Sequence, residues 1–417
     1  MSFDHPFGQF HQRKLVATTS TILLLAGMAA VGQFASNIYT PSLPSVAHDL
    51  GVSPGASQAT LAVFLCAFAI MQLVIGPLSD RYGRKPILMI GLTVFLLGTF
   101  LCNTAVDYSN LLIGRIVQGS GAAAGIVVSR ATTRDSFEGV ELARVLAAVT
   151  IAFALVPGLT PLIGGVVEQM LGWRAAFSIT GALGLALVVI VSRALPETLA
   201  TRRHVAPRSE VAEYAAILRD PVFWPNALAV ACAFASMSAF FSGAPAVLIG
   251  TLGISPIEFG LYSPIAVSGF VIGGIITRKV AATAEPRSMS LLGMSIMLAG
   301  AVLLFAPPAF GMLNKFLING AMVVHVTGLG IMLPASIAAA LQRFPQKAGV
   351  AAAMQGFLQM SGGALGAASA AGLASILADL SFPTVMLCAT ILSWLTAVRL
   401  IPNVRQMSAA SRYDSAT

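Results

Sequence analysis

Charged side chains are scarce in this sequence. Asp, Glu, Lys and Arg make up 10% of its 417 residues, whereas 57% are hydrophobic. A soluble domain usually carries about a quarter charged residues, so most of this chain is not expected to face water. The backbone of a membrane-spanning segment must satisfy its own hydrogen bonds, which predicts a helix for each long apolar run. The runs lack period-two alternation, which argues against a membrane β-barrel.

Several kinds of chemistry lack the residues they need. The four cysteines stand singly in apolar runs, without a pairing or CxxC pattern, and are expected to be packing residues. No metal-ligand cluster, nucleophile motif or phosphate loop appears, so we expect neither enzymatic activity nor a cofactor nor a metal. Basic cytoplasmic loops of a membrane protein explain the net charge of +8, and no nucleic-acid partner is expected. The first apolar run, from Leu15, continues too far for a signal peptide.

The apolar runs predict an all-α polytopic membrane protein with twelve transmembrane helices. Six runs precede and six follow the hydrophilic segment 194–222. This layout predicts an N-terminal six-helix bundle (1–193), a cytoplasmic linker (194–222) and a C-terminal six-helix bundle with a short cytoplasmic tail (223–417). The predicted spans are 16–38, 56–78, 87–105, 110–131, 142–169, 174–193, 223–249, 259–277, 288–306, 313–338, 348–378 and 383–401.

The distribution of basic residues predicts the orientation. If the N-terminus is inside, only Arg174 and Lys315 of the 24 Lys and Arg residues fall outside, and Arg115 lies within a span. Basic residues concentrate in cytoplasmic loops. Both termini are therefore expected to be cytoplasmic.

The loop after the second span carries the most specific motif, Gly76-Pro77-Leu78-Ser79-Asp80-Arg81-Tyr82-Gly83-Arg84-Lys85-Pro86. Gly and Pro permit a tight turn, and Asp80 can pair with Arg84 or with basic residues across the bundle. The loop resembles the signature between helices two and three of the major facilitator superfamily. The resemblance implies the fold of that family, and it implies that Asp80, Arg81, Gly83 and Arg84 take part in gating.

Further motifs extend the resemblance over almost the whole chain. Arg115-Ile116-Val117-Gln118-Gly119 is similar to the fourth-helix motif of the family. Pro157-Gly158-Leu159-Thr160-Pro161-Leu162-Ile163-Gly164-Gly165 resembles the fifth-helix motif of its drug–proton antiporters. Asn37-Ile38-Tyr39-Thr40-Pro41-Ser42-Leu43-Pro44 resembles a segment of the bicyclomycin/chloramphenicol-resistance exporters. By this resemblance, a hinge and seal between the bundles is expected at Pro157, Pro161, Gly164 and Gly165.

Two residues depart from the pattern of those exporters. Asn37 stands where they usually place an acid, and Thr160 stands where the antiporter motif often has Gly. Asn37 cannot titrate, so the proton-coupling mechanism of the family does not transfer directly to this position. Without an acid in the middle of any span, selection for cations is not expected, and neutral or anionic substrates remain open.

Polar residues at membrane depth are costly and usually functional. Arg115 and His325 are the clear ionisable residues within the spans. Arg115 is a candidate for binding or coupling, or else a structural residue bonded to backbone carbonyls. His325 could carry a proton or serve as a neutral packing residue, and Gln355 and Gln359 share a helix face that either lines a cavity or joins helices. The predicted binding or coupling residues are Asn37, Tyr39, Arg115, Gln118, His325, Gln355 and Gln359.

These observations favour a secondary active transporter of the bacterial inner membrane. We expect a monomer in the lipid bilayer that exports a small amphipathic drug or metabolite by alternating access, driven by protons. His325 is the first candidate for the proton carrier, and Asp80 or Glu168 at a helix end is the alternative. Transport uncoupled from protons is a third possibility. The alternative function is an uptake permease for a metabolite or a siderophore-like compound.

Overall fold

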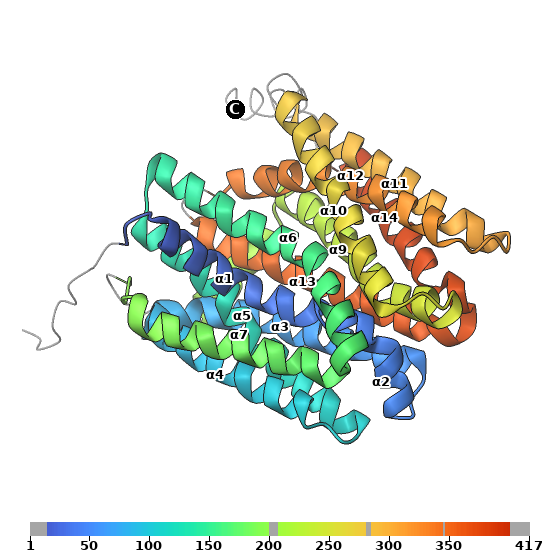
Figure 1. The fold of residues 1–417 in the computed structure, drawn as a ribbon. Coiled ribbons are helices and arrows are strands. Elements are labelled where there is room, and N and C mark those ends of the chain that lie inside the picture. Colours follow the sequence, from blue (N-terminus) through green and yellow to red (C-terminus); the bar gives the residue numbers. More distant parts are fainter. Residues whose placement is uncertain (1–14, 200–206, 281–284, 345–346, 401–417) are drawn as a thin grey trace, which may run out of the picture.

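The computed structural model describes residues 15–199, 207–280, 285–344 and 347–400, which form a bundle of long helices (Figure 1). The elements in chain order are α1 (Thr19–Asn37), η1 (Thr40–Ser42), α2 (Leu43–Asp49), α3 (Pro54–Tyr82), α4 (Arg84–Asn103), α5 (Tyr108–Ser136), α6 (Gly139–Leu171), α7 (Trp173–Ala194), α8 (Pro207–Leu218), α9 (Phe223–Pro245), η2 (Ala246–Thr251), α10 (Pro256–Val280), α11 (Pro286–Ala309), α12 (Lys315–Gln342), α13 (Ala348–Leu377), η4 (Ala378–Leu380) and α14 (Ser381–Leu400).

Within the described residues, eleven helical segments are long and apolar enough to cross a membrane. The last of them, Gly349–Leu400, contains both α13 and α14. The chain is therefore an all-helical multi-pass membrane protein, and the twelve predicted spans correspond to α1, α3–α7 and α9–α14. The helices extend a few residues beyond several predicted ends; α5, for example, continues to Ser136.

Short elements also lie between the long helices. After α1 the chain turns through η1 into α2, and α9 continues into the π-helical segment η2, which begins inside the predicted span 223–249. The predicted linker contains α8. The bundle boundaries given above remain a prediction.

Most helix contacts join neighbours within one half of the chain. In the first half α4 packs on α5 and α7, α3 packs on α5, and α1 packs on α5 and α6. In the second half α9 packs on α12, α13 and α14, and α11 packs on α12 and α14. Figure 1 shows the blue-to-green helices in one part of the molecule and the yellow-to-red helices in the other. Two pairs, α3 with α13 and α6 with α10, make the main contacts between the halves.

The two ends of the molecule differ in how the halves meet. We call the end where α3, α5 and α7 finish the linker end, and the end at η1 and the start of α10 the far end. At the far end the backbones of α6 and α10 touch: a Cβ added at Gly165 would lie 2.1 Å from the Pro256 carbonyl oxygen, and one at Gly260 would lie 2.7 Å from that of Pro161. Small residues allow such close approach of helices. The far end is closed, whereas a cavity lies between the halves at the linker end.

Candidate functional site

A small central cavity lies between the halves, with a volume of about 100 Å³. Its wall comes from α1, α3, α6, α9, α10, α12 and α13, and most of it is apolar. The polar lining residues are Gln33, Ser36, Asn37, Ser238 and Ser263. Aromatic and aliphatic walls with a few convergent polar groups are typical of small-molecule sites. No Asp, Glu, Lys, Arg or His is among the lining residues in the described part of the chain.

Asn37 is a predicted site residue that the structure places in the central cavity wall. It is the last residue of α1 and is 5% exposed. Its Nδ2 donates to the Gln33 carbonyl oxygen at 2.8 Å and to Ser36 Oγ at 2.8 Å. These bonds occupy the donor side of the amide, so its carbonyl oxygen is the group left for a ligand.

Arg115 lies inside the first half and is fully buried. Its Nη1 donates to Gln118 Oε1 at 2.7 Å, and its guanidinium carbon lies 4.3 Å from the Phe64 ring centroid and 5.1 Å from that of Tyr39. Longer bonds of 3.4 Å reach the carbonyl oxygens of Ala35 and Thr60. Among the described residues no carboxylate pairs with this cation, so aromatic faces and backbone oxygens compensate its charge.

Tyr39 and Gln118 surround this arginine and do not line the central cavity. The Tyr39 hydroxyl accepts from Thr60 Oγ1 at 3.2 Å. Gln118 Nε2 donates to Thr99 Oγ1 at 2.9 Å and so ties α5 to α4. Tyr39, Arg115 and Gln118 form one buried group behind the cavity wall, in which each residue orients the next.

The predicted site residues of the second half lie outside the cavity wall as well. His325 on α12 is fully buried, with Nε2 2.9 Å from Ser236 Oγ and Nδ1 2.9 Å from the Met297 carbonyl oxygen. It therefore joins α12 to α9 and α11. Gln355 and Gln359 on α13 are 4% and 5% exposed, and both amide atoms of Gln355 are without a hydrogen-bond partner in the described structure.

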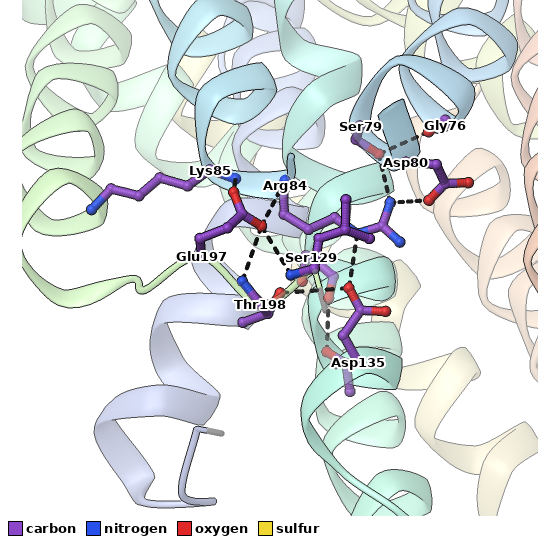
Figure 2. A network of polar contacts seen from close by, with 11 residues as sticks. Gly76, Ser79, Asp80, Arg84, Lys85, Ser129, Asp135, Glu197 and Thr198 are labelled. Carbon is purple, nitrogen blue, oxygen red and sulfur yellow. Dashed lines mark hydrogen bonds and ion pairs between the residues drawn. The ribbon is translucent and has the colours of Figure 1, made fainter. Parts of the chain in front are cut away.

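One group of predicted gating residues lies at the linker end, where Asp80 and Arg84 belong to one polar network (Figure 2). The Arg84 side chain pairs with Asp80, donates from Nε to Asp135 Oδ2 at 2.8 Å, and donates from Nη1 to Ser79 Oγ at 2.8 Å. Arg84 is 7% exposed. A planar guanidinium can hold two carboxylates in fixed directions. This group connects the end of α3 and the start of α4 to the end of α5.

Glu197, just after α7, closes the same network from the other side (Figure 2). Its carboxylate accepts from the backbone N–H of Arg84 at 3.0 Å and of Lys85 at 3.1 Å, which are the first residues of α4. A carboxylate is favourable at a helix N-terminus. Gly83 has φ +107°, a backbone conformation that favours glycine, and a Cβ there would lie 2.6 Å from Glu197 Oε2, so a larger residue would also displace this carboxylate.

The other predicted gating residues lie apart from this network. Arg81 is exposed, and its guanidinium carbon lies 5.3 Å from the Tyr82 ring centroid. Pro157 and Pro161 are inside α6, which continues unbroken past both, and Pro157 also lines the central cavity. Gly164 and Gly165 lie at the far end, where a Cβ on Gly164 would meet the Ile38 carbonyl oxygen at 2.1 Å.

A larger cavity of about 590 Å³ opens at the linker end. Its wall comes from α3, the start of α4, α5, α8 and α13, thus from both halves of the chain. The charged lining residues are Asp80, Arg84, Arg130, Arg134, Asp135, Glu213 and Lys347. Phe153 lines the central cavity. Its ring centroid lies 5.8 Å from the guanidinium carbon of Arg130, so the two cavities approach each other there.

Asp80→Asn is expected to reduce transport while leaving the amount of protein in the membrane little changed. The amide removes one of the two carboxylates that neutralise Arg84, but Asp135 and Ser79 still hold the guanidinium. Losing one hydrogen bond to a charged group costs about 1.5–3 kcal/mol, which is enough to shift a two-state equilibrium of the gate. Transport in vesicles, normalised to protein by immunoblot, measures the effect. Wild-type transport by Asp80→Asn would mean that the loop only anchors the topology.

Several residues of these sites were not predicted. They are Asp135, Glu197, Arg130 and Arg134, none of which is among the residues that the sequence predicted for binding, coupling or gating. For Asp135, the signal in the sequence was its position beside Arg134 at the end of a span. Glu197 follows α7 by only a few residues, yet its partners are over 100 residues away in sequence.

Comparison with known proteins matches residues 25–367 to the family model described as Major Facilitator Superfamily. Multidrug resistance protein D of Escherichia coli is 28% identical over 332 residues, covering 79% of this chain and 82% of the relative. A chloramphenicol resistance protein of Pseudomonas aeruginosa is 28% identical over 402 residues, covering 95% of this chain and 93% of the relative. Among solved structures, a bacterial homologue of the human lysosomal transporter Spinster, inward-facing and unoccupied, has a TM-score of 0.70 at 16% identity and covers 92% of this chain and 97% of that one.

Proposed function

Because the chain belongs to the Major Facilitator Superfamily and is thus a secondary transporter and not an enzyme, we propose that it exports a small amphipathic drug or metabolite. The observation that carries this proposal is the central cavity between the halves, whose wall is apolar with a few neutral polar groups. Such a wall binds an apolar body by burial and orients it through Gln33, Asn37 and Ser263.

The direction of transport rests on the relatives. Proteins 28% identical to this chain are named for multidrug and chloramphenicol resistance, and a transporter can give resistance by removing the compound from the cell. The cavity at the linker end supports loading from that side, and the distribution of Lys and Arg supports a cytoplasmic location of that side. The protein would then lie in a bacterial inner membrane as a monomer, with both termini cytoplasmic.

The energy would come from protons. A coupling group must alternate between exposure to the two sides, and Asn37 in the cavity wall cannot titrate. His325, the first candidate from the sequence, is enclosed between α9, α11 and α12 in this conformation, so coupling through it requires those helices to move. Glu168 is the acid of α6 near the closed far end; it is 8% exposed, and its Oε2 has no hydrogen-bond partner in the described structure. His325 and Glu168 are therefore the two candidate proton carriers for a test by substitution.

The decisive experiment combines resistance with transport. A bacterial host without its own major efflux pumps, expressing the gene, is expected to tolerate higher concentrations of at least one compound from a drug and metabolite panel that includes chloramphenicol and bicyclomycin. In inside-out vesicles the same compound should accumulate, and a protonophore should stop the accumulation. Accumulation that persists with the protonophore would reject proton coupling, and accumulation only in right-side-out vesicles would favour the uptake permease.

Substrate-induced proton release from purified protein separates the carriers. Wild type, His325→Gln and Glu168→Gln are compared at equal substrate saturation. The variant that binds substrate but no longer releases protons identifies the carrier. Undiminished release from His325→Gln would eliminate the histidine.

A further inference from the structure

The cavity at the linker end contains more positive than negative charge. Its wall holds four cations, Arg84, Arg130, Arg134 and Lys347, and three carboxylates, Asp80, Asp135 and Glu213. Each carboxylate has a cation within ion-pair distance: Arg84 pairs with Asp80 and Asp135, and Lys347 Nζ lies 3.2 Å from Glu213 Oε1. The carboxylates are therefore already engaged, and none is free to attract a cationic ligand.

Arg130 and Arg134 are the two cations of this wall for which no ion pair or hydrogen bond is found among the described residues. They stand one turn apart on α5, on the same helix face, and both are half-buried. Two like charges at this spacing repel each other. An anion placed between them removes that repulsion and gains charge-assisted hydrogen bonds.

Arg130 lies on the route from this cavity to the central one. Its guanidinium carbon is 5.8 Å from the Phe153 ring centroid, and Phe153 belongs to the central cavity wall. From Arg134 to Arg130 to Phe153 the environment thus changes from charged to aromatic. A ligand with an anionic group and an apolar body matches this order, with the group on the arginines and the body in the central cavity.

The opposite wall adds further donors. The helix α13 begins at Ala348 without a side-chain cap, and Gly349 and Val350 of its first turn line the cavity. The backbone N–H groups at a helix start favour anions. A Cβ at Gly349 would lie 3.3 Å from Arg134 Nη1, so this arginine extends from the first half to the first turn of α13 in the second.

We propose that Arg130 and Arg134 bind the anionic group of an amphipathic substrate entering from the linker end, so that organic anions with an apolar body are the preferred substrate class. The inference rests on the proposed transport function. The shared chemistry is a single carboxylate, sulfonate or phosphate, which a substrate and an anionic phospholipid could each supply. Binding at this site would bring the two halves together through α5 and α13.

The test measures binding alone, with no membrane potential or pH gradient, so it is independent of whether transport is proton-driven. Full-length protein is placed in phosphatidylcholine nanodiscs and titrated with two fluorescent probes, with empty nanodiscs as the baseline. Anilinonaphthalene sulfonate is the anion, and N-phenylnaphthylamine is the neutral compound with the same rings but no sulfonate. A difference between the probes therefore reports the anionic group.

In the double variant Arg130→Gln/Arg134→Gln the sulfonate is expected to bind about tenfold more weakly, as for the loss of a charge-assisted hydrogen bond, while the neutral probe binds as to wild type. Retained binding of the neutral probe also shows that the variant is folded. Arg130→Lys/Arg134→Lys keeps the charges and should retain most sulfonate binding. Arg144→Gln is the matched control, since Arg144 is exposed on α6 near the same end and outside the cavity wall.

Equal losses for both probes, or no loss for the sulfonate, would overturn the proposal. So would an equal loss in Arg144→Gln. The lipid is distinguished by repeating the titration in nanodiscs that contain phosphatidylglycerol. Sulfonate binding to wild type should be unchanged there; competitive displacement by phosphatidylglycerol that disappears in the Gln double variant would show that the site holds a lipid headgroup, which overturns the assignment to substrate.

Discussion

Arg115→Ala is expected to abolish transport. The substitution removes a fully buried guanidinium that contacts three elements: Gln118 on α5, the Ala35 carbonyl on α1 and the Thr60 carbonyl on α3. It also leaves Phe64 and Tyr39 facing an empty space where the cation lay. Since α1 supplies Asn37 to the central cavity wall, loosening this group disturbs the cavity as well.

Arg115→Lys is expected to rescue poorly. A lysine restores the charge but lacks the planar fork that reaches Gln118 and lies over two rings. Losing hydrogen bonds to a charged group costs about 2 kcal/mol, or roughly a thirtyfold loss of function if the cost falls on the active state. Initial rates in inside-out vesicles, normalised to protein, measure both variants.

The readout must separate misfolding from a functional defect. Thermal stability in detergent and binding of a neutral probe are recorded for each variant, and Gln118→Glu is added because it supplies the carboxylate that this cation lacks. Normal transport by both Arg115→Ala and Arg115→Lys would show that Arg115 neither organises the site nor takes part in coupling.

Gly165→Ala is expected to slow transport by at least about fivefold. Its added Cβ would lie 2.1 Å from the Pro256 carbonyl oxygen and 2.8 Å from the carbonyl carbon. Backbone atoms of α10 cannot yield as a flexible side chain does, so α6 and α10 must separate at the far end. Overpacking costs about 1–3 kcal/mol, and here the cost falls on the conformation closed at the far end, which shifts the population away from it.

Labelling tests this shift directly. In a cysteine-free background, Ile257→Cys at the start of α10 should react faster with a membrane-impermeant maleimide when Gly165 is Ala. Gly274→Ala is the control. Gly274 is on α10, the helix that carries Ile257, and an added Cβ there meets no atom within 4 Å. If Gly165→Ala transports as fast as the control variant, close packing at the far end does not limit the cycle.

The membrane spans could be predicted because lipid imposes a length and a composition on every spanning helix. The same rule cannot predict α2, α8 or η2. These elements are short, and local contacts with neighbouring helices determine them. The motif predicted that Asp80 pairs either with Arg84 or with basic residues across the bundle, and the structure contains the pair with Arg84.

The sequence could not predict which side chains inside the bundle face the central cavity. Asn37 and His325 are both polar residues within apolar runs, yet the first lines the central cavity and the second is enclosed among α9, α11 and α12. In a bundle surrounded by lipid nearly every helix face is apolar, so periodicity does not show which face meets the cavity. Contacts between distant segments, such as Glu197 with the start of α4, depend on the assembled fold.

The contacts of Glu197 also set a length limit. On one side of the connecting segment Glu197 holds the chain to α4 of the first half; on the other side Asp220 lies 3.5 Å from Arg343, and Glu213 lies 3.2 Å from Lys347, in the second half. Eight peptide steps form the tether from Leu199, the last described residue after α7, to Pro207, the first residue of α8. A fully extended chain covers about 3.5 Å per residue, so this tether reaches at most about 28 Å. The tether therefore acts as a mechanical stop that limits how far the halves can swing apart on that side.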